Sequence, residues 1–272
     1  MIHSIEKALS LPAARPGFGR EKIEALLQGY DNYCKLQNCK NAKEIDALVF
    51  GTIHAYIAFQ KACCPEFDLE FIPPRFRDVQ ANGCAGVSSD SLCDFSNLTF
   101  SDFAMSRHSL RYYGSLPIQI ETIKKAVSLA QTAPSACNRQ PTHVYACVNT
   151  EKIDTIMAFH GGMKGFGRPQ AILAVTGALG AYTSEYERNT VHVDCGLFAM
   201  NLLYALHYYG LATCPIIWGS EPDNDKKIRK ILDIPECETV ALLITVGSYP
   251  ADSYRFAKAQ RKEINTVFDV IN

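Results

Sequence analysis

The spacing of apolar residues divides the chain into two parts of different character. Before residue 104, apolar positions recur every three or four residues over 23–33 and again over 45–57, which predicts two amphipathic helices. Residues 65–103 show no sustained period and carry several prolines and serines. Because this stretch is also rich in phenylalanine, we expect an ordered covering loop there and not a flexible linker.

From residue 104 onward, helical and strand patterns alternate. Helical spacing predicts helices over 118–132, 151–159, 191–209 and 223–232, and apolar runs predict strands over 143–148, 171–178, 213–217 and 240–246. The helix over 191–209 is apolar on most faces, so it needs cover from a sheet on one side and, in one arrangement, from a second subunit on the other. We expect a helical extension with its covering loop over 1–103, and over 104–272 an α+β domain whose central sheet is wrapped by helices.

Composition and charge narrow the class of protein. The 272 residues carry 27 Lys and Arg against 28 Asp and Glu, so the formal net charge of −1 removes the main electrostatic reason for binding nucleic acid or an acidic membrane. Glu6 and Lys7 interrupt the apolar stretch of a signal peptide, and no run approaches the ~18 apolar residues of a membrane span. The eleven cysteines lack C-x-x-C spacing, so we expect a reduced, cytoplasmic protein whose thiols mostly fill the core.

Three polar clusters could carry chemistry. The first, Arg107-His108-Ser109-Leu110-Arg111, offers two guanidinium groups and a hydroxyl for an anion, although alone it also fits a solvated basic turn. The second, over 134–141, joins a helix to a strand, and two prolines bracket its polar side chains. Those side chains are Ser135, Asn138 and Gln140. The third is Arg261 near the C-terminus, which alone is an exposed tail charge.

In this order and spacing, the clusters resemble the nitroreductase-like family of FMN-dependent oxidoreductases. Residues 133–141 read APSACNRQP, a full match to the family pattern Ala-Pro-Ser-x-x-Asn-x-Gln-Pro, and an Arg-His-Ser-x-Arg turn precedes them. Residues 209–215 (YGLATCP) and 246–250 (VGSYP) look similar to the strands that follow the family's central helix. The resemblance covers about 104–266. It implies a nitroreductase-like α+β fold with a mostly antiparallel sheet and a domain-intertwined homodimer.

The resemblance implies a role for each matching residue. Those that would hold the FMN phosphate are Arg107, Ser109 and Arg261, with His108 beside it and Arg111 nearby. Those that would meet the flavin ring and ribityl chain from the other subunit are Ser135, Asn138 and Gln140. The segment that would pass over the ring, with backbone N–H groups near flavin N5, contains Pro215, Ile216, Trp218 and Gly219.

The sequence departs from the family pattern at two places. A basic residue before the second strand often stabilises the reduced flavin, and here both Lys164 and Arg168 fit, of which Lys164 is preferred as the charge stabiliser. The family's acidic residue after the Pro215 position is replaced by Ile217 and Trp218. Trp218 is the only tryptophan, and it fits core packing as well as a contact with the ring.

Other catalytic sites are not expected. Cys137 falls on a variable position of the matched pattern, so no catalytic thiol is predicted. His192 and Asp194 lie two residues apart in a predicted helix, hence on different faces, and no metal site is predicted.

The resemblance implies an FMN-dependent oxidoreductase that uses NAD(P)H as hydride donor and reduces a small acceptor, nitroaromatic or quinone-like in vitro. Chemistry would occur at flavin N5, so no side-chain nucleophile is required. Two alternatives stay open. The missing acidic residue fits a flavin-binding or interaction protein with little turnover, and the N-terminal extension fits a specialised reductase whose lid restricts the substrate.

Overall fold

The computed structural model describes residues 1–35, 42–78, 85–219 and 221–271. The chain forms two compact units: Met1–Asp90 with Arg255–Asn272, and Ser91–Tyr254. These bounds differ from the segments 1–103 and 104–272 that we expected, since the C-terminal residues belong to the same unit as the N-terminal ones. The assignment of 1–103 as a separate extension stays a prediction.

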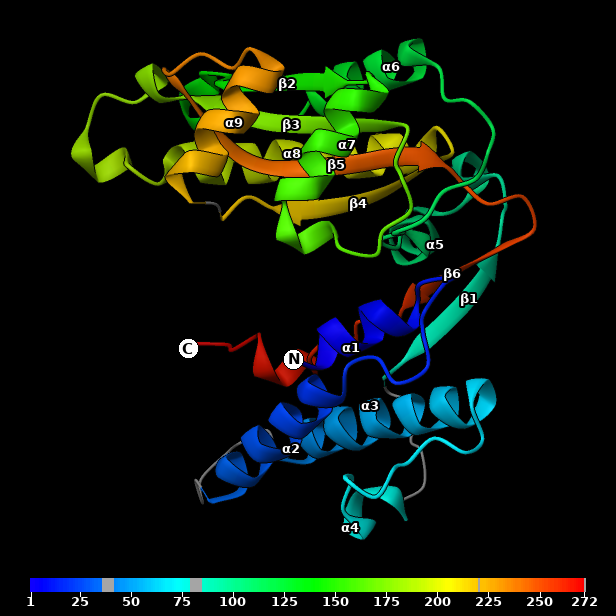
Figure 1. The fold of residues 1–272 in the computed structure, drawn as a ribbon. Helices are drawn as coiled ribbons and strands as arrows, with labels where there is room; N and C mark the ends of the chain where they lie inside the picture. The colour runs from blue at the N-terminus through cyan, green and yellow to red at the C-terminus, as the bar shows by residue number, and fades with distance from the viewer. Residues whose placement is uncertain (36–41, 79–84, 220, 272) are drawn as a thin grey trace. The chain divides into compact units, whose positions relative to one another are not determined.

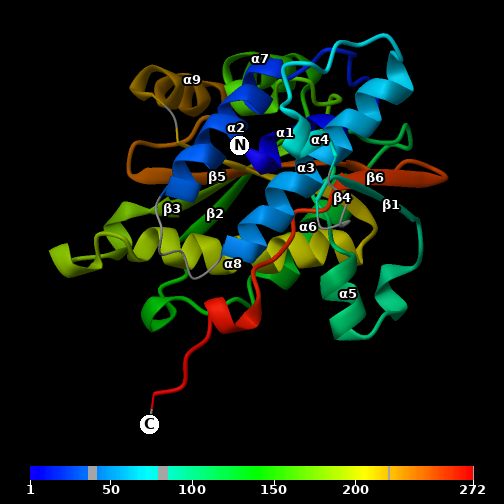
Figure 2. The ribbon, with the colours of Figure 1, turned by 90° about the horizontal axis from the view of Figure 1, so that it is seen from below.

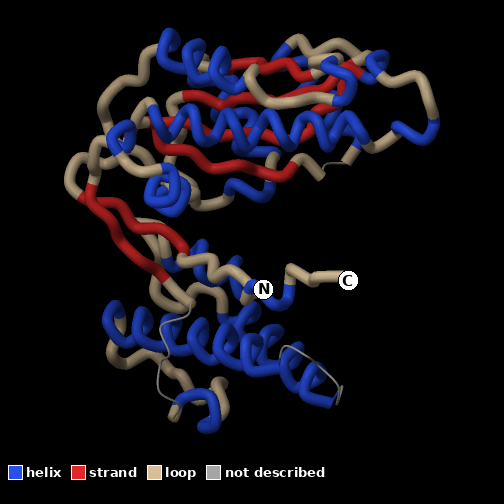
Figure 3. Tube along the Cα trace, turned by 180° about the vertical axis from the view of Figure 1, so that it is seen from behind, coloured by secondary structure: helices blue, strands red, loops and turns tan. Residues whose placement is uncertain are grey.

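The first unit is mainly helical; the periodicity predicted its second and third helices, whereas the first was not predicted and the fourth lies in a stretch expected to be a loop. Its helices are α1 (Ile2–Leu9), α2 (Arg20–Lys35), α3 (Ala42–Cys63) and α4 (Pro74–Arg77). They share one apolar core, whose largest fully buried members are Tyr56, Phe76, Ile5, Ile23, Ile53 and Ile72. Figure 3 shows this preponderance of helix in the unit.

A two-stranded sheet explains why the C-terminal residues belong to the first unit. Strand β1 (Val87–Ser91) pairs with β6 (Ser253–Ala257). Beyond this pair, the N–H of Lys258 donates to the carbonyl of Gly86 across 3.0 Å. The guanidinium of Arg255 donates to the carbonyl of Leu9 across 2.8 Å. Neither strand was predicted. The segment of β1 is polar, and it becomes a strand only through pairing with a partner some 160 residues away, not through its own pattern.

The second unit is built on a four-stranded antiparallel sheet, which confirms the predicted α+β class. The strands are β2 (Thr142–Cys147), β3 (Ala171–Ala178), β4 (Leu211–Ile217) and β5 (Glu238–Ser248), and their order is β2-β3-β5-β4. Each pair is antiparallel, with Val144 opposite Val175, Val175 opposite Leu242, and Leu242 opposite Ile217. Strands β2 and β4 therefore form the two edges of this sheet.

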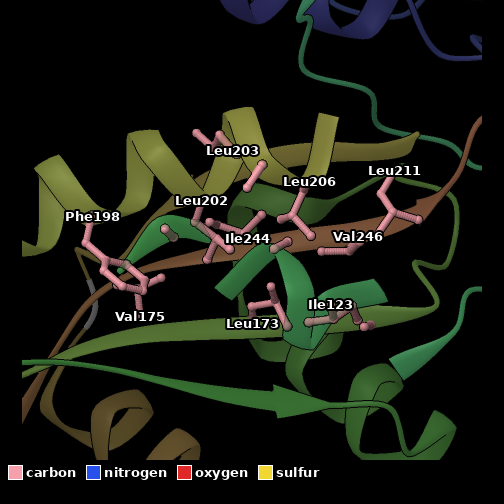
Figure 4. Close-up of a cluster of buried hydrophobic side chains, with 14 of the residues drawn as sticks. Ile123, Leu173, Val175, Phe198, Leu202, Leu203, Leu206, Leu211, Ile244 and Val246 are labelled. Carbon is pink, nitrogen blue, oxygen red and sulfur yellow. The ribbon is translucent and has the colours of Figure 1, made fainter. Parts of the chain in front are cut away.

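Helices cover both faces of the sheet (Figures 1 and 2). On one face lie α6 (Ile120–Ala130) and α8 (Thr190–Tyr208), and on the other α7 (Thr150–Phe159) and α9 (Pro222–Leu232). The alternation of side chains along β3 serves both: Leu173 and Val175 pack toward α6 and α8, whereas Ile172 and Ala174 pack toward α7 and α9. Figure 4 shows the first of these cores.

Helix α8 approaches the sheet unusually closely because β3 carries a glycine beneath it. A Cβ atom at Gly177 would lie 2.3 Å from Val191 Cγ2 and 2.8 Å from Cys195 Sγ. The side of α8 that faces the sheet is buried, as predicted for a helix apolar on most faces. Its outer side exposes Val193, Leu197 and Met200. None of the helices among the described residues combines the length and the apolar character that a membrane crossing requires.

Candidate functional site

The first polar cluster lies along the outer edge of β4. It follows α5 (Phe100–Ser106), and Ser109 forms an isolated parallel bridge with Thr213. The N–H of Leu110 donates to the carbonyl of Thr213 across 2.9 Å, and the Leu110 side chain is fully buried. Arg111 is also buried, and its guanidinium donates to the carbonyl of Ser109. The basic turn is therefore fixed to the sheet, which a solvated turn would not be.

A buried histidine fixes the residues immediately before this cluster. His207 of α8 contacts the hydroxyl of Ser106 through Nε2 at 2.8 Å and that of Tyr249 through Nδ1 at 2.9 Å. Burial, with smaller contributions from the positive charges of Arg107 and His108, lowers the pKa of His207 to about 3. The imidazole is thus neutral at physiological pH, and it ties the end of α5 to α8 and β5.

The edge of β4 next to this cluster presents backbone groups outward. Pro215 has no N–H, so its pair with Ile244 cannot be one in which both residues exchange hydrogen bonds. The alternation of an antiparallel ladder then turns the backbone groups of Thr213 and Ile217 away from β5 as well. This is observed, since the carbonyl of Thr213 accepts from Leu110 and that of Ile217 accepts from Nε2 of His160 across 3.1 Å.

Side chains at the end of β4 point in opposite directions. Ile216 is buried in the core beneath α7 and α9, whereas the side chain of Ile217 is 82% exposed. The indole N–H of Trp218 donates to Asp225 Oδ1 across 3.1 Å, and its ring lies 5.5 Å from that of His160. The structure therefore places the Trp218 side chain in packing against α9. Gly219 is exposed, whereas the backbone of Ile216 faces β5, because its pair with Leu243 is one in which both residues exchange hydrogen bonds.

The loop before β3 lies against the first cluster. The N–H of Gly167 donates to the carbonyl of Arg111 across 2.9 Å, and the guanidinium of Arg111 lies 5.9 Å from the ring of Phe166. Of the two basic residues that competed for the role of charge stabiliser, Arg168 pairs with Asp154 at 2.8 Å, and Lys164 is exposed. Arg168 is thus engaged with Asp154, and the role of Lys164 as charge stabiliser stays a prediction.

The second polar cluster adopts a strained backbone at the opposite edge of the sheet, just before β2. Three of its residues have positive φ: Cys137 (52°), Asn138 (54°) and Gln140 (48°). For residues other than glycine this conformation costs about 1–3 kcal/mol each, so surrounding contacts must impose it. One such contact lies within the loop, where the N–H of Gln140 donates to Ser135 Oγ across 2.9 Å.

Buried groups outside the loop also hold it. The carboxylate of Asp194 on α8 accepts the N–H of Ala136 with both oxygens at 3.1 Å, and Oδ2 accepts the hydroxyl of Tyr182 at 2.6 Å. A partly exposed ion pair of 2.5 Å between Arg139 and Glu187 adds to these buried contacts. Beside the loop lies a cavity of 140 Å³, whose lining includes Ser135, Gln140, Asp194 and Phe198.

Along the chain, the predicted site residues fall into separate groups. The sheet brings Arg107, Ser109, Arg111, the loop that contains Lys164, and Pro215–Gly219 to the edge at β4. The group of Ser135, Asn138 and Gln140 lies just before β2, at the opposite edge of the sheet, and the two edges are three strand spacings, or about 14 Å, apart. Arg261 belongs to the first unit, after β6, where its guanidinium donates to the carbonyl of Ala259.

Sequence reasoning missed three residues that shape these groups: His160, Tyr182 and Asp194. Asp194 was considered only as a metal ligand with His192. A carboxylate within a helix that is apolar on most faces was the available signal, because such a group needs hydrogen-bond donors when buried. No pattern in the sequence pointed to Tyr182 or His160, whose partners lie 12 and 57 residues away.

Comparison with known proteins places this arrangement in a family. The profile of the Nitroreductase family matches residues 104–175 and 156–248. The chain belongs to the nitroreductase family. A candidate NADH dehydrogenase/NAD(P)H nitroreductase from Archaeoglobus fulgidus is 30% identical over 158 residues, which are 57% of this chain and 87% of that protein.

Solved structures of nitroreductase-like proteins share the fold. A nitroreductase-like protein from Streptococcus mutans is 21% identical, with a TM-score of 0.55 over 64% of this chain and 98% of its own. A protein from Staphylococcus epidermidis, named as a candidate NAD(P)H:FMN oxidoreductase, is 19% identical, with a TM-score of 0.54 over 67% and 98%. The nitroreductase match includes both polar clusters and β4, whereas Arg261 and residues 1–103 lie outside it.

Proposed function

We propose that this member of the nitroreductase family binds FMN and transfers hydride from NAD(P)H, through flavin N5, to a small nitroaromatic or quinone-like acceptor. The observation that carries the proposal is the bridge between Ser109 and Thr213, which fixes a basic turn beside the outward-facing backbone at Ile217. Membership of the family and the name of the relative from Staphylococcus epidermidis support the choice of cofactor.

The residues present fit the chemistry of FMN. A phosphate dianion is best bound by guanidinium groups and a hydroxyl, which Arg107, Arg111 and Ser109 supply within five residues. The N–H of Ile217 faces the outer edge of β4, where it suits an acceptor nitrogen such as flavin N5. When bound, FMN supplies a ring that accepts hydride at N5 and passes two electrons to an acceptor.

The remaining predicted residues concern the charge of the flavin ring and the surface beside it. The ammonium of Lys164 is exposed on the loop that contacts Arg111, so we assign it to stabilise negative charge that develops on the flavin ring. The exposed side chain of Ile217 adds an apolar surface where the family often has an acid. The resemblance in sequence also assigns Arg261 to an FMN phosphate, and His108 is the neighbour of Arg107 in the basic turn.

We also propose that the active form is a domain-intertwined homodimer. Ser135, Asn138 and Gln140 lie at the edge of the sheet opposite the basic turn, so they suit a flavin held by the partner better than one held by their own subunit. The outer side of α8 supports the same proposal, because Val193 and Leu197 are exposed although large apolar side chains on a helix usually seek cover.

The proposal is tested by adding FMN to purified protein and removing free flavin by gel filtration. We expect a yellow protein with the absorption of oxidised flavin that oxidises NADH or NADPH when menadione is present. Protein that stays colourless would refute the proposal. Flavin retained without oxidation of NAD(P)H would support the alternative of a flavin-binding protein with little turnover, which the apolar Ile217 favours.

The dimer is tested separately by light scattering of wild-type protein and two variants. Leu197→Arg should yield monomers and reduce flavin retention, because it places a charge on the outer side of α8. Val148→Arg serves as the control, since Val148 is also an exposed apolar residue but follows β2. A wild-type protein that is monomeric at micromolar concentration would contradict the proposal.

A further inference from the structure

We propose that Asp194 is the positioning residue of the second polar cluster: its buried carboxylate fixes Ala136, and through it the placement of Ser135, Asn138 and Gln140 toward the flavin. The inference rests on the proposed function for the flavin contact, but not for the anchoring itself. The carboxylate belongs to a helix of the protein core, whereas the residues that it would position belong to an irregular loop.

The carboxylate of Asp194 is held in one orientation. The residue is 3% exposed, both oxygens lie 3.1 Å from the amide nitrogen of Ala136, and the hydroxyl of Tyr182 donates to Oδ2 across 2.6 Å. The helix that carries it cannot shift easily, because α8 packs directly onto Gly177 of β3. The Ala136 amide is therefore attached to a rigid part of the fold.

The loop needs such an attachment because its other contacts fix its shape more than its position. The bond from Gln140 N–H to Ser135 Oγ joins two residues of the loop itself. The ion pair of Arg139 with Glu187 reaches outside the loop, but these side chains are 28% and 26% exposed and therefore screened by solvent. At the far end of the loop, the N–H of Ala178 on β3 donates to the carbonyl of Pro141 across 2.9 Å, one residue before β2 begins. Asp194 supplies the buried external contact at the other end, at the residue immediately before the left-handed positions.

The cavity beside the loop links this anchoring to a ligand. Ser135, Gln140 and Asp194 line the same 140 Å³ space, so the carboxylate holds two of the predicted flavin contacts at its wall. Loss of the anchor would let the three left-handed residues relax toward ordinary backbone conformations. The side chains of Asn138 and Gln140 would then lose the directions that the strained backbone gives them.

The experiment uses full-length protein and two readouts, FMN affinity by quenching of flavin fluorescence and amide hydrogen exchange of residues 135–140 without FMN. Asp194→Ala should weaken FMN binding about ten- to a hundredfold, as expected when a buried donor loses its acceptor. It should also accelerate exchange at Ala136 about tenfold or more. Asp194→Asn should restore both values to within about threefold of wild type, because the amide oxygen still accepts the Ala136 N–H.

The matched control is Cys195→Ala, which removes a buried group from the next position of α8, whose sulfur accepts from the hydroxyl of Thr142 on β2 and not from the loop backbone. It should lower stability while leaving FMN affinity and exchange over 135–140 unchanged. If Asp194→Ala does not fold, Tyr182→Phe, which removes the donor that orients the carboxylate, should produce smaller changes of the same sign. Unchanged exchange and affinity in a folded Asp194→Ala protein would overturn the inference. A wild type that binds no FMN would refute the proposed function alone, because the exchange measurement still tests the anchor.

Discussion

The hydroxyl of Tyr249 donates to Nδ1 of His207 across 2.9 Å in the interior of the second unit, which contains the four-stranded sheet. The direction follows from the other partner: Ser106 Oγ donates to the carbonyl of Phe103, so Nε2–H of His207 donates to Ser106 Oγ. Protonation of Nδ1 would turn it into a donor that faces the hydroxyl donor of Tyr249 in a buried environment. The neutral imidazole is therefore part of the fold that positions the basic turn.

Folding stability should decrease as the pH falls below about 6.5. The pKa of His207 is lowered to about 3 in the folded protein, from 6.5, so the unfolded chain binds the additional proton between these values and acid favours unfolding. At 1.36 kcal/mol for each pH unit, the loss between pH 6.5 and pH 5 is about 2 kcal/mol. Urea denaturation at pH 7 and pH 5 measures it.

His207→Gln is the control for this effect, because the amide retains a donor and an acceptor but does not titrate. The variant should be less stable at pH 7 and should lose about 2 kcal/mol less than wild type between the two pH values. An equal pH dependence in both proteins would contradict the assignment to His207.

Much of the sheet domain could be predicted from local pattern. The apolar run predicted over 171–178 is strand β3, because a strand buried on both faces is apolar throughout. The 3.6-residue period likewise located α6 and α8 to within two residues. Helix α5 was not predicted, since its seven residues are too few for a period to show and none is buried.

The candidate site was less predictable, for a physical reason. A motif reports which residues are present, but the side on which β4 presents its backbone depends on pairing with β5. The packing of Trp218 likewise depends on Asp225, seven residues later on another element. The pairing of β1 with β6 also could not be predicted locally, and a deletion of residues 1–100 would remove the strand that pairs with Ser253–Ala257.

The glycine under α8 should be intolerant of any side chain. Gly177→Ala places a Cβ atom 2.3 Å from Val191 Cγ2, so the helix must move and the variant should lose about 1–3 kcal/mol. Gly180→Ala is the matched control, since a Cβ atom there meets nothing within 4 Å. Thermal unfolding of the two proteins distinguishes them, and equal midpoints would contradict the close approach.

Adjacent isoleucines at the end of β4 should respond differently to the same change. Ile216→Ser leaves a hole and a hydroxyl in the core beneath α7 and α9, and should cost about 2–4 kcal/mol. Ile217→Ser should change stability by less than about 0.5 kcal/mol, because that side chain is exposed. Chemical denaturation measures both values, and a reversed order would show that β4 presents the opposite face.

The first cluster should discriminate FMN from riboflavin. Arg107→Gln removes a charged donor for the phosphate, so FMN affinity should fall about ten- to a hundredfold, whereas riboflavin, which has no phosphate, should bind within about twofold of wild type. The FMN affinity of the variant should also depend less on salt than that of wild type, since one attractive charge is lost. Lys124→Gln controls for net charge, because Lys124 is an exposed cation on α6 that pairs with Glu121. Equal losses for both flavins would instead assign Arg107 to the ring site or to the fold.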